Sequence, residues 1–471
     1  DILNILMCKE LTYNTCRVNA TNKNKNAWKT LSKDITITGK NGKPLEANLT
    51  SVPASALGIF ANLKEGEGIS SSDSNIKHAA NVWKTEAKTT GKDGKVLFSA
   101  IRHRNTRGTE MATKEIILAA AVEQYGTEAL QNSPEGKVWE VRMGNIQLMS
   151  PPKEIFNRIL SSSDKNRSIE QTNAFEKLHN ETIEVPILDK NKKEKKIKLK
   201  LLGSSLSFNF GTNKAHYGYG GLLVKSSYDK NKKSLEKLFG ENFLKSLEKE
   251  YKGKKSKNKK ENNTLNSAYF YNHFDSYVSG EAGKYLNSLS DQKNEILESI
   301  NEIEKISKKT NEDLDDLNKE IKAAEEIDLK RKKIKNLSKQ ILDLWFTTHG
   351  EGIASNPAAI QTRLAALLYL IGYPITFNCK SGKDRTGEVA AEINDLVLTM
   401  EANGGEVPDP YKELSDKEKV QASRVYDATQ SDEIAKANTG FRGLKVSYKN
   451  TTNRMGKMKG SSKFSSITSQ S

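Results

Sequence analysis

The chain has 471 residues, with 75 lysines and arginines against 59 aspartates and glutamates, which gives a formal net charge of +16 at neutral pH. This length is enough for one large hydrophobic core or two to three ordinary ones, so the class of small domains that depend on covalent cross-links is excluded. The positive charge predicts an anionic partner, such as nucleic acid, an acidic membrane leaflet or a polyphosphate.

In the first half of the chain, residues 35–38, 139–143, 183–187 and 197–210 are typical of strands. The charged stretch 189–196 between the last two predicts a solvated hairpin tip, with a functional basic patch as the alternative. Together these segments predict an α/β fold with a mixed sheet and surrounding helices.

Residues from 296 to 324 place apolar side chains at alternating spacings of three and four, with charged residues between them. The phase slips near Ile327 and restarts at Ile334, which predicts two antiparallel helices or a coil with a local irregularity. We expect a long helical hairpin or coiled-coil insertion within one chain, with dimerisation as the alternative. The lysine-rich segment 251–263 before it predicts an exposed linker.

From residue 440 to residue 471 the chain carries seven lysines and arginines and no acidic residue. Such a tail is either a solvated segment or a contact with an acidic membrane surface. Both interpretations stay open from the sequence.

The three cysteines, Cys8, Cys16 and Cys379, match neither a disulfide framework nor a zinc site, which predicts a reducing compartment. The longest apolar run, 364–371, is too short to cross a bilayer, so we expect a soluble protein. The six histidines show no ligand spacing, and we expect neither a metal nor another cofactor.

One constellation carries chemistry. Residues 375–378 predict a strand, the string Cys-Lys-Ser-Gly-Lys-Asp-Arg-Thr-Gly follows at 379–387, and an amphipathic helical pattern comes next. A loop between a strand and a helix directs backbone N–H groups into a concavity beside the positive end of the helix, which favours a phosphate dianion. The same field lowers the pKa of a cysteine thiol, so Cys379 is the candidate nucleophile.

Each neighbour of Cys379 has a role in this hypothesis. Arg385 binds two phosphoryl oxygens through a bidentate guanidinium. Gly382, which follows Ser381 in the loop, lets the backbone approach the phosphate oxygens closely. Asp384 is the candidate general acid, or else one half of an ion pair that shapes the loop. Thr386 bonds the sulfur or orients water. Lys380 and Lys383 add positive charge that favours a substrate with several phosphates. The alternative is that this charge only stabilises the thiolate.

The 379–387 string resembles the signature of the SopB/IpgD-like family of type III secreted phosphoinositide phosphatase effectors. Five further segments resemble family segments in the same order: 76–84 (IKHAANVWK), 97–103 (LFSAIRH), 206–213 (LSFNFGTN), 239–244 (FGENFL) and 438–446 (NTGFRGLKV). Two residues depart from the family pattern, Lys214 in place of an acidic residue and Arg442 in place of a proline, and these affect positional specificity.

The resemblance implies a bacterial effector secreted into the host cytosol, acting at the cytosolic face of host membranes. Its implied reaction is the removal or transfer of a phosphate of phosphatidylinositol 4,5-bisphosphate or related lipids. The resemblance also implies that Cys379 is the nucleophile, that Arg385 binds the phosphate being removed and that the two loop lysines contact ring phosphates. Arg102, His103, Asn209 and Gly211 fall in family-like segments, and we expect them near the site as substrate contacts. A host protein partner is implied through the helical insertion or the N-terminal region, and no nucleic acid is expected.

We therefore divide the chain into an N-terminal segment (1–75), a first part of a cysteine-phosphatase-like domain (76–285), a helical insertion (286–344), the catalytic-loop part (345–440) and a basic tail (441–471). A phosphatase of soluble inositol polyphosphates and a phosphoinositide-binding scaffold without turnover remain as alternatives. Loss of activity in Cys379→Ser would exclude the scaffold.

Overall fold

In a computed structural model of the chain, the structure describes residues 27–72, 77–91, 94–148, 163–210, 225–255, 267–305, 310–348, 356, 358–440 and 442. The predictions for Cys8, Cys16, Gly211 and Lys214, and for the tail apart from Arg442, lie outside these residues.

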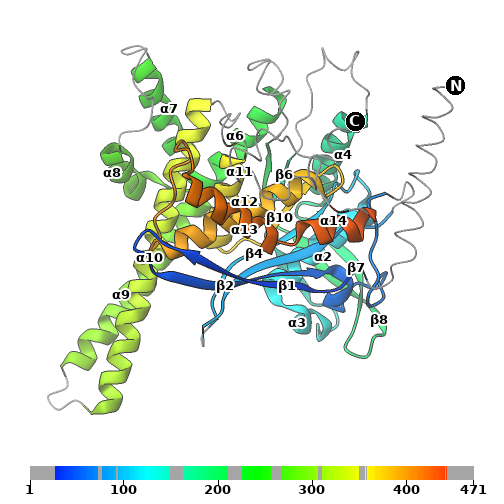
Figure 1. The fold of residues 1–471 in the computed structure, drawn as a ribbon, viewed down its shortest axis with the longest axis horizontal. Coiled ribbons are helices and arrows are strands. Elements are labelled where there is room, and N and C mark those ends of the chain that lie inside the picture. Colours follow the sequence, from blue (N-terminus) through cyan, green and yellow to red (C-terminus); the bar gives the residue numbers. More distant parts are fainter. Residues whose placement is uncertain are drawn as a thin grey trace.

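A seven-stranded mixed sheet forms the centre of the protein, with the strand order β1-β2-β3-β4-β10-β6-β9 (Figure 1). The first four strands pair antiparallel, and β4, β10, β6 and β9 pair parallel. The strands are β1 (Leu31–Thr38), β2 (Pro44–Pro53), β3 (Trp83–Thr89), β4 (Val96–Arg104), β6 (Gly144–Gln147), β9 (Leu206–Asn209) and β10 (Ile375–Cys379). The predicted mixed sheet is confirmed.

A second sheet has three strands in the order β5-β8-β7, comprising β5 (Val138–Val141), β7 (Thr182–Leu188) and β8 (Glu194–Leu201). β7 and β8 form the predicted antiparallel hairpin, closed by a turn at residues 189–193. The prediction of one strand over 197–210 was wrong, because β8 ends at Leu201 and β9 belongs to the other sheet. The turn between them, in which the N–H of Ser205 donates to the carbonyl of Leu202, redirects the chain.

Helices surround both sheets (Figure 1). They are η1 (Ala54–Leu57), α2 (Glu110–Tyr125), α3 (Thr127–Gln131), α4 (Ser163–Leu178), α6 (Lys225–Phe239), α7 (Glu241–Lys255), α8 (Ser267–Tyr277), α9 (Glu281–Glu304), α10 (Asn311–Thr348), α11 (Ala359–Leu370), α12 (Asp384–Ala402), α13 (Asp416–Ala428) and α14 (Ser431–Thr439).

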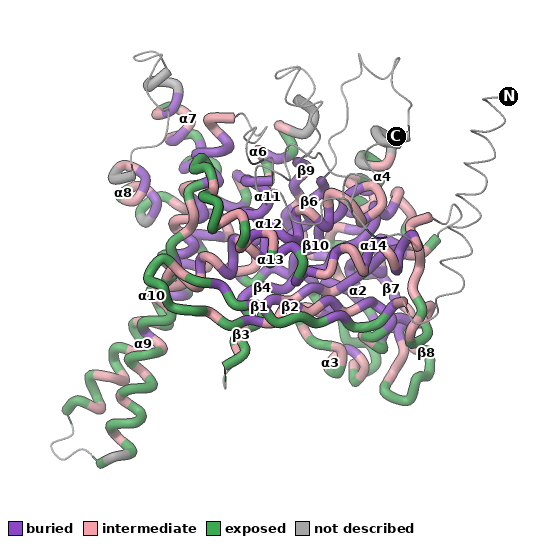
Figure 2. Tube along the Cα trace, in the orientation of Figure 1, coloured by how far each residue is buried: buried purple, intermediate pink, exposed green. Residues whose placement is uncertain are grey.

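The large sheet separates two hydrophobic cores, because successive strand side chains point to opposite faces. On β4, Ala100 joins the core that contains α11 and α12, whereas its neighbour Ile101 joins the core that contains α2 and the three-stranded sheet. β10 lies in the middle of the sheet, and all five of its residues are buried. Figure 2 shows the same distribution, with buried segments gathered at the centre. The last residue of β10 is therefore held by packing on both faces.

Helices α9 and α10 pack against each other and project from the body as an arm (Figures 1 and 2). The predicted phase slip at Ile327 does not interrupt a helix, since α10 runs continuously from Asn311 to Thr348 and the chain reverses between α9 and α10 instead. Toward the end of the arm the apolar side chains lose their cover, and Leu297, Leu314 and Ile321 are exposed.

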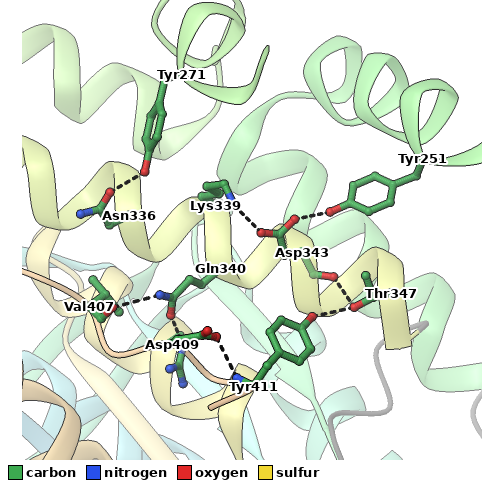
Figure 3. Close-up of polar contacts among 11 residues, drawn as sticks. Tyr251, Tyr271, Asn336, Lys339, Gln340, Asp343, Thr347, Val407, Asp409 and Tyr411 are labelled. Atoms are coloured by element: carbon green, nitrogen blue, oxygen red, sulfur yellow. Dashed lines mark hydrogen bonds and ion pairs between the residues drawn. The ribbon is translucent and has the colours of Figure 1, made fainter. Parts of the chain in front are cut away.

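The other end of α10 is fixed to the body by polar contacts (Figure 3). The hydroxyl of Tyr251 donates to the buried Asp343, and Lys339 pairs with the same carboxylate at 2.7 Å. Tyr271 donates to Asn336 at 2.6 Å. The prediction of an exposed linker from residue 251 was wrong at its start, because Tyr251 is buried in α7 against α10; residues 256–263 lie outside the described part of the chain.

Candidate active site

Cys379 ends β10, and α12 begins five residues later at Asp384, so the predicted order of strand, loop and helix is confirmed. The strand forms because β-branched and aromatic side chains in its sequence (ITFNC) fit a buried sheet. The loop 380–383 lies at the carboxyl end of the parallel strands, which is where open α/β sheets bind ligands.

The backbone of Cys379 is held on two sides. Its N–H donates to Oγ1 of Thr386 at 2.9 Å, and Thr386 is itself fully buried in the first turn of α12. Its carbonyl accepts from the N–H of Asn105 at 3.1 Å, just beyond the end of β4. The thiol is thus fixed between the neighbouring parallel strand and the start of the helix.

Electrostatics at this position favour a thiolate. Burial raises the pKa of the Cys379 thiol, and the charge of Asp384 acts in the same direction. The positive charge of Arg385 and hydrogen bonds from the side chain and backbone of Thr386 lower it by more, so the pKa of Cys379 lies below the ordinary value for cysteine. A buried sulfur with a lowered pKa requires such a cationic surrounding.

Arg385 and Lys383 are both engaged at the mouth of the loop. The Nη1 group of Arg385 donates to the carbonyl of Leu148 at 2.7 Å, next to the end of β6. Lys383 forms an ion pair with Asp384 at 3.2 Å. The arginine therefore lies across the end of the strand beside β10, with its guanidinium anchored at one nitrogen.

Gly382 has a left-handed backbone, with φ of +66°, and no other residue fits its place. A Cβ atom there would approach the backbone carbonyl of His103 to 2.6 Å and the N–H nitrogen of Arg104 to 2.7 Å. The loop can pack this closely on the end of β4 only because glycine lacks a side chain. This contact sets the distance between the loop and the sheet.

Two predicted substrate contacts, Arg102 and His103, lie inside the protein and are fully buried. Arg102 donates to the hydroxyl of Ser431 on α14 at 3.1 Å, while its Nε and Nη2 groups have no hydrogen-bond partner among the described residues. Burial lowers the pKa of Arg102 to about 10, against the opposing charge of Cys379. Burial also lowers the pKa of His103 to about 4, so this imidazole is neutral at physiological pH. Arg102 thus supplies a second positive charge within reach of the sulfur.

The remaining predicted contacts lie at the same edge of the sheet. Asn209 ends β9, where it exchanges backbone hydrogen bonds with the side chain of Asn231 on α6. β6 lies between β9 and β10, so Asn209 stands two strand spacings, about 10 Å, from Cys379. Lys380 and Ser381 are partly exposed in the loop itself.

Three residues at the site were not predicted from the sequence. The side chain of Asn81 donates to the carbonyls of Ser381 and Gly382, and Ser431 accepts from Arg102. Glu388, one turn into α12, has a carboxyl whose pKa is raised to about 7 by burial and by Glu392. Only the position of Asn81 in a family-like segment pointed to it in the sequence. Nothing in the sequence pointed to Ser431 or Glu388.

A cavity of about 680 Å³ lies at the opposite end of β10, between the arm and the sheet. Tyr285, Lys330 and Pro374 are among its lining residues, and no residue of the 379–387 loop is. Within the described part of the chain, no group of three or more histidine, cysteine, aspartate or glutamate side chains could hold a metal ion. No helix among the described residues is long and apolar enough to cross a bilayer.

Residues 11–269 and 321–456 match the family described as "Enterobacterial virulence protein IpgD". The chain belongs to this family. The residues between the two matched segments, 270–320, include α9, which forms half of the arm.

Among curated relatives, the inositol phosphate phosphatase IpgD of Shigella sonnei is 26% identical over 447 residues, which span 90% of this chain and 67% of the relative. The inositol phosphate phosphatase SopB of Salmonella typhi is 24% identical over 444 residues, which span 90% of this chain and 64% of the relative.

Two solved structures share the fold. One is a Legionella phosphoinositide phosphatase, SidF, with a TM-score of 0.57 and 12% identity over 94% of this chain and 75% of its own. The other is a second Legionella phosphoinositide phosphatase structure, with a TM-score of 0.54 and 12% identity over 90% of this chain and 73% of that one.

Proposed function

We propose that this IpgD-family protein is a cysteine-dependent phosphatase of inositol phospholipids. The observation that carries the proposal is a buried thiol at the carboxyl end of a parallel strand, whose pKa is lowered by Arg385 and Thr386. Membership of a family whose curated relatives are named inositol phosphate phosphatases supports it. The cysteine-phosphatase-like fold of residues 76–285 and 345–440 is part of the proposal.

The reaction has two steps. The thiolate of Cys379 attacks phosphorus, the bond to the ring oxygen breaks, and a phosphocysteine forms. The leaving alkoxide takes a proton from Asp384. Water then attacks the phosphocysteine and gives a proton back to Asp384, releasing inorganic phosphate and the thiolate, while Arg385 and the loop amides hold the phosphoryl charge. Thr386 keeps the sulfur in place through both steps.

The ion pair between Lys383 and Asp384 fits this scheme. In the free protein it holds the carboxyl at the loop, 3.2 Å from the lysine. A second phosphate on the substrate would draw Lys383 to itself, because a phosphate carries more negative charge than a carboxylate. Asp384 would then no longer be held as the ionised partner of this lysine, and it could carry the proton that it donates to the leaving group. This coupling favours a substrate with more than one phosphate.

For the substrate we propose phosphatidylinositol 4,5-bisphosphate or a related lipid. Lys380 and Lys383 give the loop two extra positive charges, and the net charge of +16 favours an anionic leaflet. As a family member the protein would act as a secreted effector in the host cytosol, at the cytosolic face of host membranes. Arg102, His103 and Asn209 lie around the loop, with Arg102 acting through its charge.

The arm is the part of the chain that we propose for a host protein partner. It falls mostly between the two segments that match the family. Leu297, Leu314 and Ile321 are exposed on it, and an exposed apolar row on a helix is a common docking surface. We also propose that residues 286–344 are a coiled-coil insertion. A contact with a host protein through the N-terminal region is the alternative proposal.

A phosphoinositide panel with product identification tests the function. Wild type and Cys379→Ser are compared on liposomes and on soluble headgroups, and the position of the lost phosphate is read from the product. We expect turnover on liposomes that Cys379→Ser abolishes. Equal turnover on soluble headgroups would instead favour an inositol polyphosphate phosphatase. Activity that is unchanged in Cys379→Ser, or absent from wild type while binding persists, would overturn the proposal.

A further inference from the structure

Asn81 joins the sequence segment 76–84 to the phosphate loop. Its side-chain amide nitrogen donates to the carbonyl of Gly382 at 2.8 Å and lies 3.3 Å from the carbonyl of Ser381. Asn81 is almost completely buried, and it has a left-handed backbone with φ of +52°, which asparagine adopts more readily than most residues. The burial, the backbone conformation and the two hydrogen bonds together fix the side chain of Asn81 against the loop.

The amide of Asn81 is itself held in one orientation. The indole N–H of the buried Trp83 donates to Oδ1 of Asn81 at 3.0 Å, and Trp83 stacks on Trp28 with ring centroids 5.3 Å apart. Because the oxygen accepts from the indole, the nitrogen must face the loop. The orientation of Asn81 therefore does not depend on the loop.

A second asparagine, Asn438 at the end of α14, supports Asn81 through the segment 69–72. Its Oδ1 accepts from the N–H of Ser71 at 2.7 Å, and its Nδ2 donates to the hydroxyl of Ser71 at 2.9 Å. In the same segment, the carbonyl of Ile69 accepts from the N–H of Asn81 at 2.8 Å. Hydrogen bonds thus connect three family-like segments that are far apart in the sequence.

We propose that Asn81 is a positioning residue that holds the phosphate loop in its phosphate-binding shape, and that Asn438 holds Asn81 through residues 69–72. A planar peptide directs its C=O and its N–H to opposite sides. When the carbonyl of Gly382 is bound by Asn81, the N–H of Lys383 points away from Asn81, to the side on which the loop would receive phosphate. Gly382 complements this contact by allowing the loop to rest on β4.

The proposal deepens the proposed function and rests on it, so its test needs readouts that do not depend on the lipid. We would measure alkylation of Cys379 against pH, protection from alkylation by inorganic phosphate and vanadate, and kcat and KM on liposomes. The variants are Asn81→Ala, Asn81→Asp and Asn438→Ala. Asn81→Asp keeps the shape of the side chain but presents oxygens to the loop carbonyls.

Asn180→Ala is the matched control. Asn180 also has a left-handed backbone, with φ of +63°, and its side chain also bonds to the backbone, accepting from the N–H of Gly203 at 2.9 Å. That contact lies in the turn before β7, apart from the phosphate loop. Asn180 is exposed whereas Asn81 is buried, so the control matches the backbone conformation and the loss of a side-chain hydrogen bond to the backbone, without touching the site.

We expect Asn81→Ala and Asn81→Asp to lower kcat about 10- to 100-fold with a smaller change in KM, since misplacing a reacting group by about 1 Å costs this much. Alkylation at pH 6.5 should slow about tenfold and phosphate should protect less, with the same direction and smaller size in Asn438→Ala. Asn180→Ala should match wild type in all three readouts.

Two outcomes separate the failure of this inference from the failure of the function. If wild-type Cys379 titrates as an ordinary thiol and phosphate does not protect it, the proposed function fails. If the wild-type thiol behaves as proposed, and Asn81→Ala lowers the melting temperature but leaves kcat, alkylation and protection unchanged, Asn81 serves stability alone and the positioning role is overturned.

Discussion

The N–H of Cys379 donates to the hydroxyl oxygen of Thr386 at 2.9 Å, so the last residue of β10 and the first turn of α12 are joined directly across the phosphate loop. Both residues are buried. Because Thr386 also lowers the pKa of the thiol, one side chain both shapes the loop and stabilises the proposed nucleophile.

Replacing this hydroxyl should therefore impair both properties. Thr386→Val keeps the branched shape but leaves the N–H of Cys379 unbonded and removes the side-chain hydrogen bond that lowers the pKa of the thiol. A hydrogen bond to a charged group such as the thiolate contributes about 1.5–3 kcal/mol. We expect the pKa of Cys379 to rise, and turnover to fall about 10- to 100-fold. Alkylation rate against pH and liposome assays measure these changes. Thr386→Ser, which keeps the hydroxyl, should retain most activity; equal losses in the two variants would contradict the role of the hydrogen bond.

Gly382→Ala should abolish turnover while the rest of the fold persists. The new Cβ would lie 2.6 Å from the carbonyl of His103, in a backbone conformation that already costs alanine about 1–2 kcal/mol. The loop must move away from β4, which separates the phosphate-binding groups from Cys379.

Gly372→Ala separates strain from position. Gly372 also has a positive φ, +84°, but its Cβ would meet no atom of the described part of the chain within 4 Å. We expect a similar loss of melting temperature from the backbone strain and nearly normal turnover. Circular dichroism with heating and the liposome assay, applied to both variants, test this difference; an active Gly382→Ala would show that the loop need not rest on β4.

The order of strand, loop and helix around Cys379 could be predicted from the sequence, whereas the contacts that hold the loop in place could not. Cys379, Gly382 and Arg385 were proposed as site residues because phosphate chemistry demands particular residue types at short spacings within one loop. Asn81 and Ser431 were missed because their contacts join segments about 300 residues from the loop or from β4, and no local pattern records such pairings. Tyr251 was assigned to a linker because its neighbours are rich in lysine, although its side chain is buried and bonds to Asp343 on α10.

The division of 197–210 into two strands of different sheets illustrates the same limit. Alternation of apolar residues identifies strands, but the partner of a strand depends on the rest of the chain. The arm was predicted more successfully, because the helical period is a local property. One of the two predicted arrangements, a pair of antiparallel helices, places the reversal near Ile327 instead of between α9 and α10, because a change of apolar phase need not end a helix.

Arg102 should contribute to the reactivity of Cys379 without touching substrate. It is fully buried, and its charge and that of the thiolate favour each other. Arg102→Gln removes the charge and keeps a polar side chain, so we expect the pKa of Cys379 to rise and alkylation near neutral pH to slow. kcat should fall and KM should change little, because Arg102 has no surface at the loop mouth.

The matched variant for Arg102 is Ser431→Ala, which removes its hydrogen-bond partner on α14 but keeps the charge. We expect a smaller effect on alkylation and a modest loss of stability, about 1 kcal/mol for one hydrogen bond. A rise in KM with unchanged kcat in Arg102→Gln would indicate direct substrate contact instead of an electrostatic role.

Glu388 should make the stability of the folded protein depend on pH. Burial raises the pKa of this carboxyl from 4.5 to about 7, with Glu392 and Asp384 acting in the same direction and Arg385 opposing them. Glu388 is partly exposed, so water reduces the contribution of this pKa shift to the free energy of unfolding. Between pH 4.5 and 7 the folded state binds more protons than the unfolded state, so the free energy of unfolding falls as the pH rises through this window.

Glu388→Gln should remove this component. A carboxyl with these two pKa values lowers the free energy of unfolding by up to about 3 kcal/mol between the acidic and neutral ends of the window, at about 1.4 kcal/mol per pH unit. We therefore expect urea unfolding at pH 5, 6 and 7.5 to give a smaller decline for Glu388→Gln than for wild type, with the variant the more stable protein at pH 7.5. Glu298→Gln, on the exposed surface of α9, is the control, and it should follow wild type at every pH. Parallel curves for wild type and Glu388→Gln would show that the carboxyl is ionised over the whole range and that Arg385 dominates its surroundings.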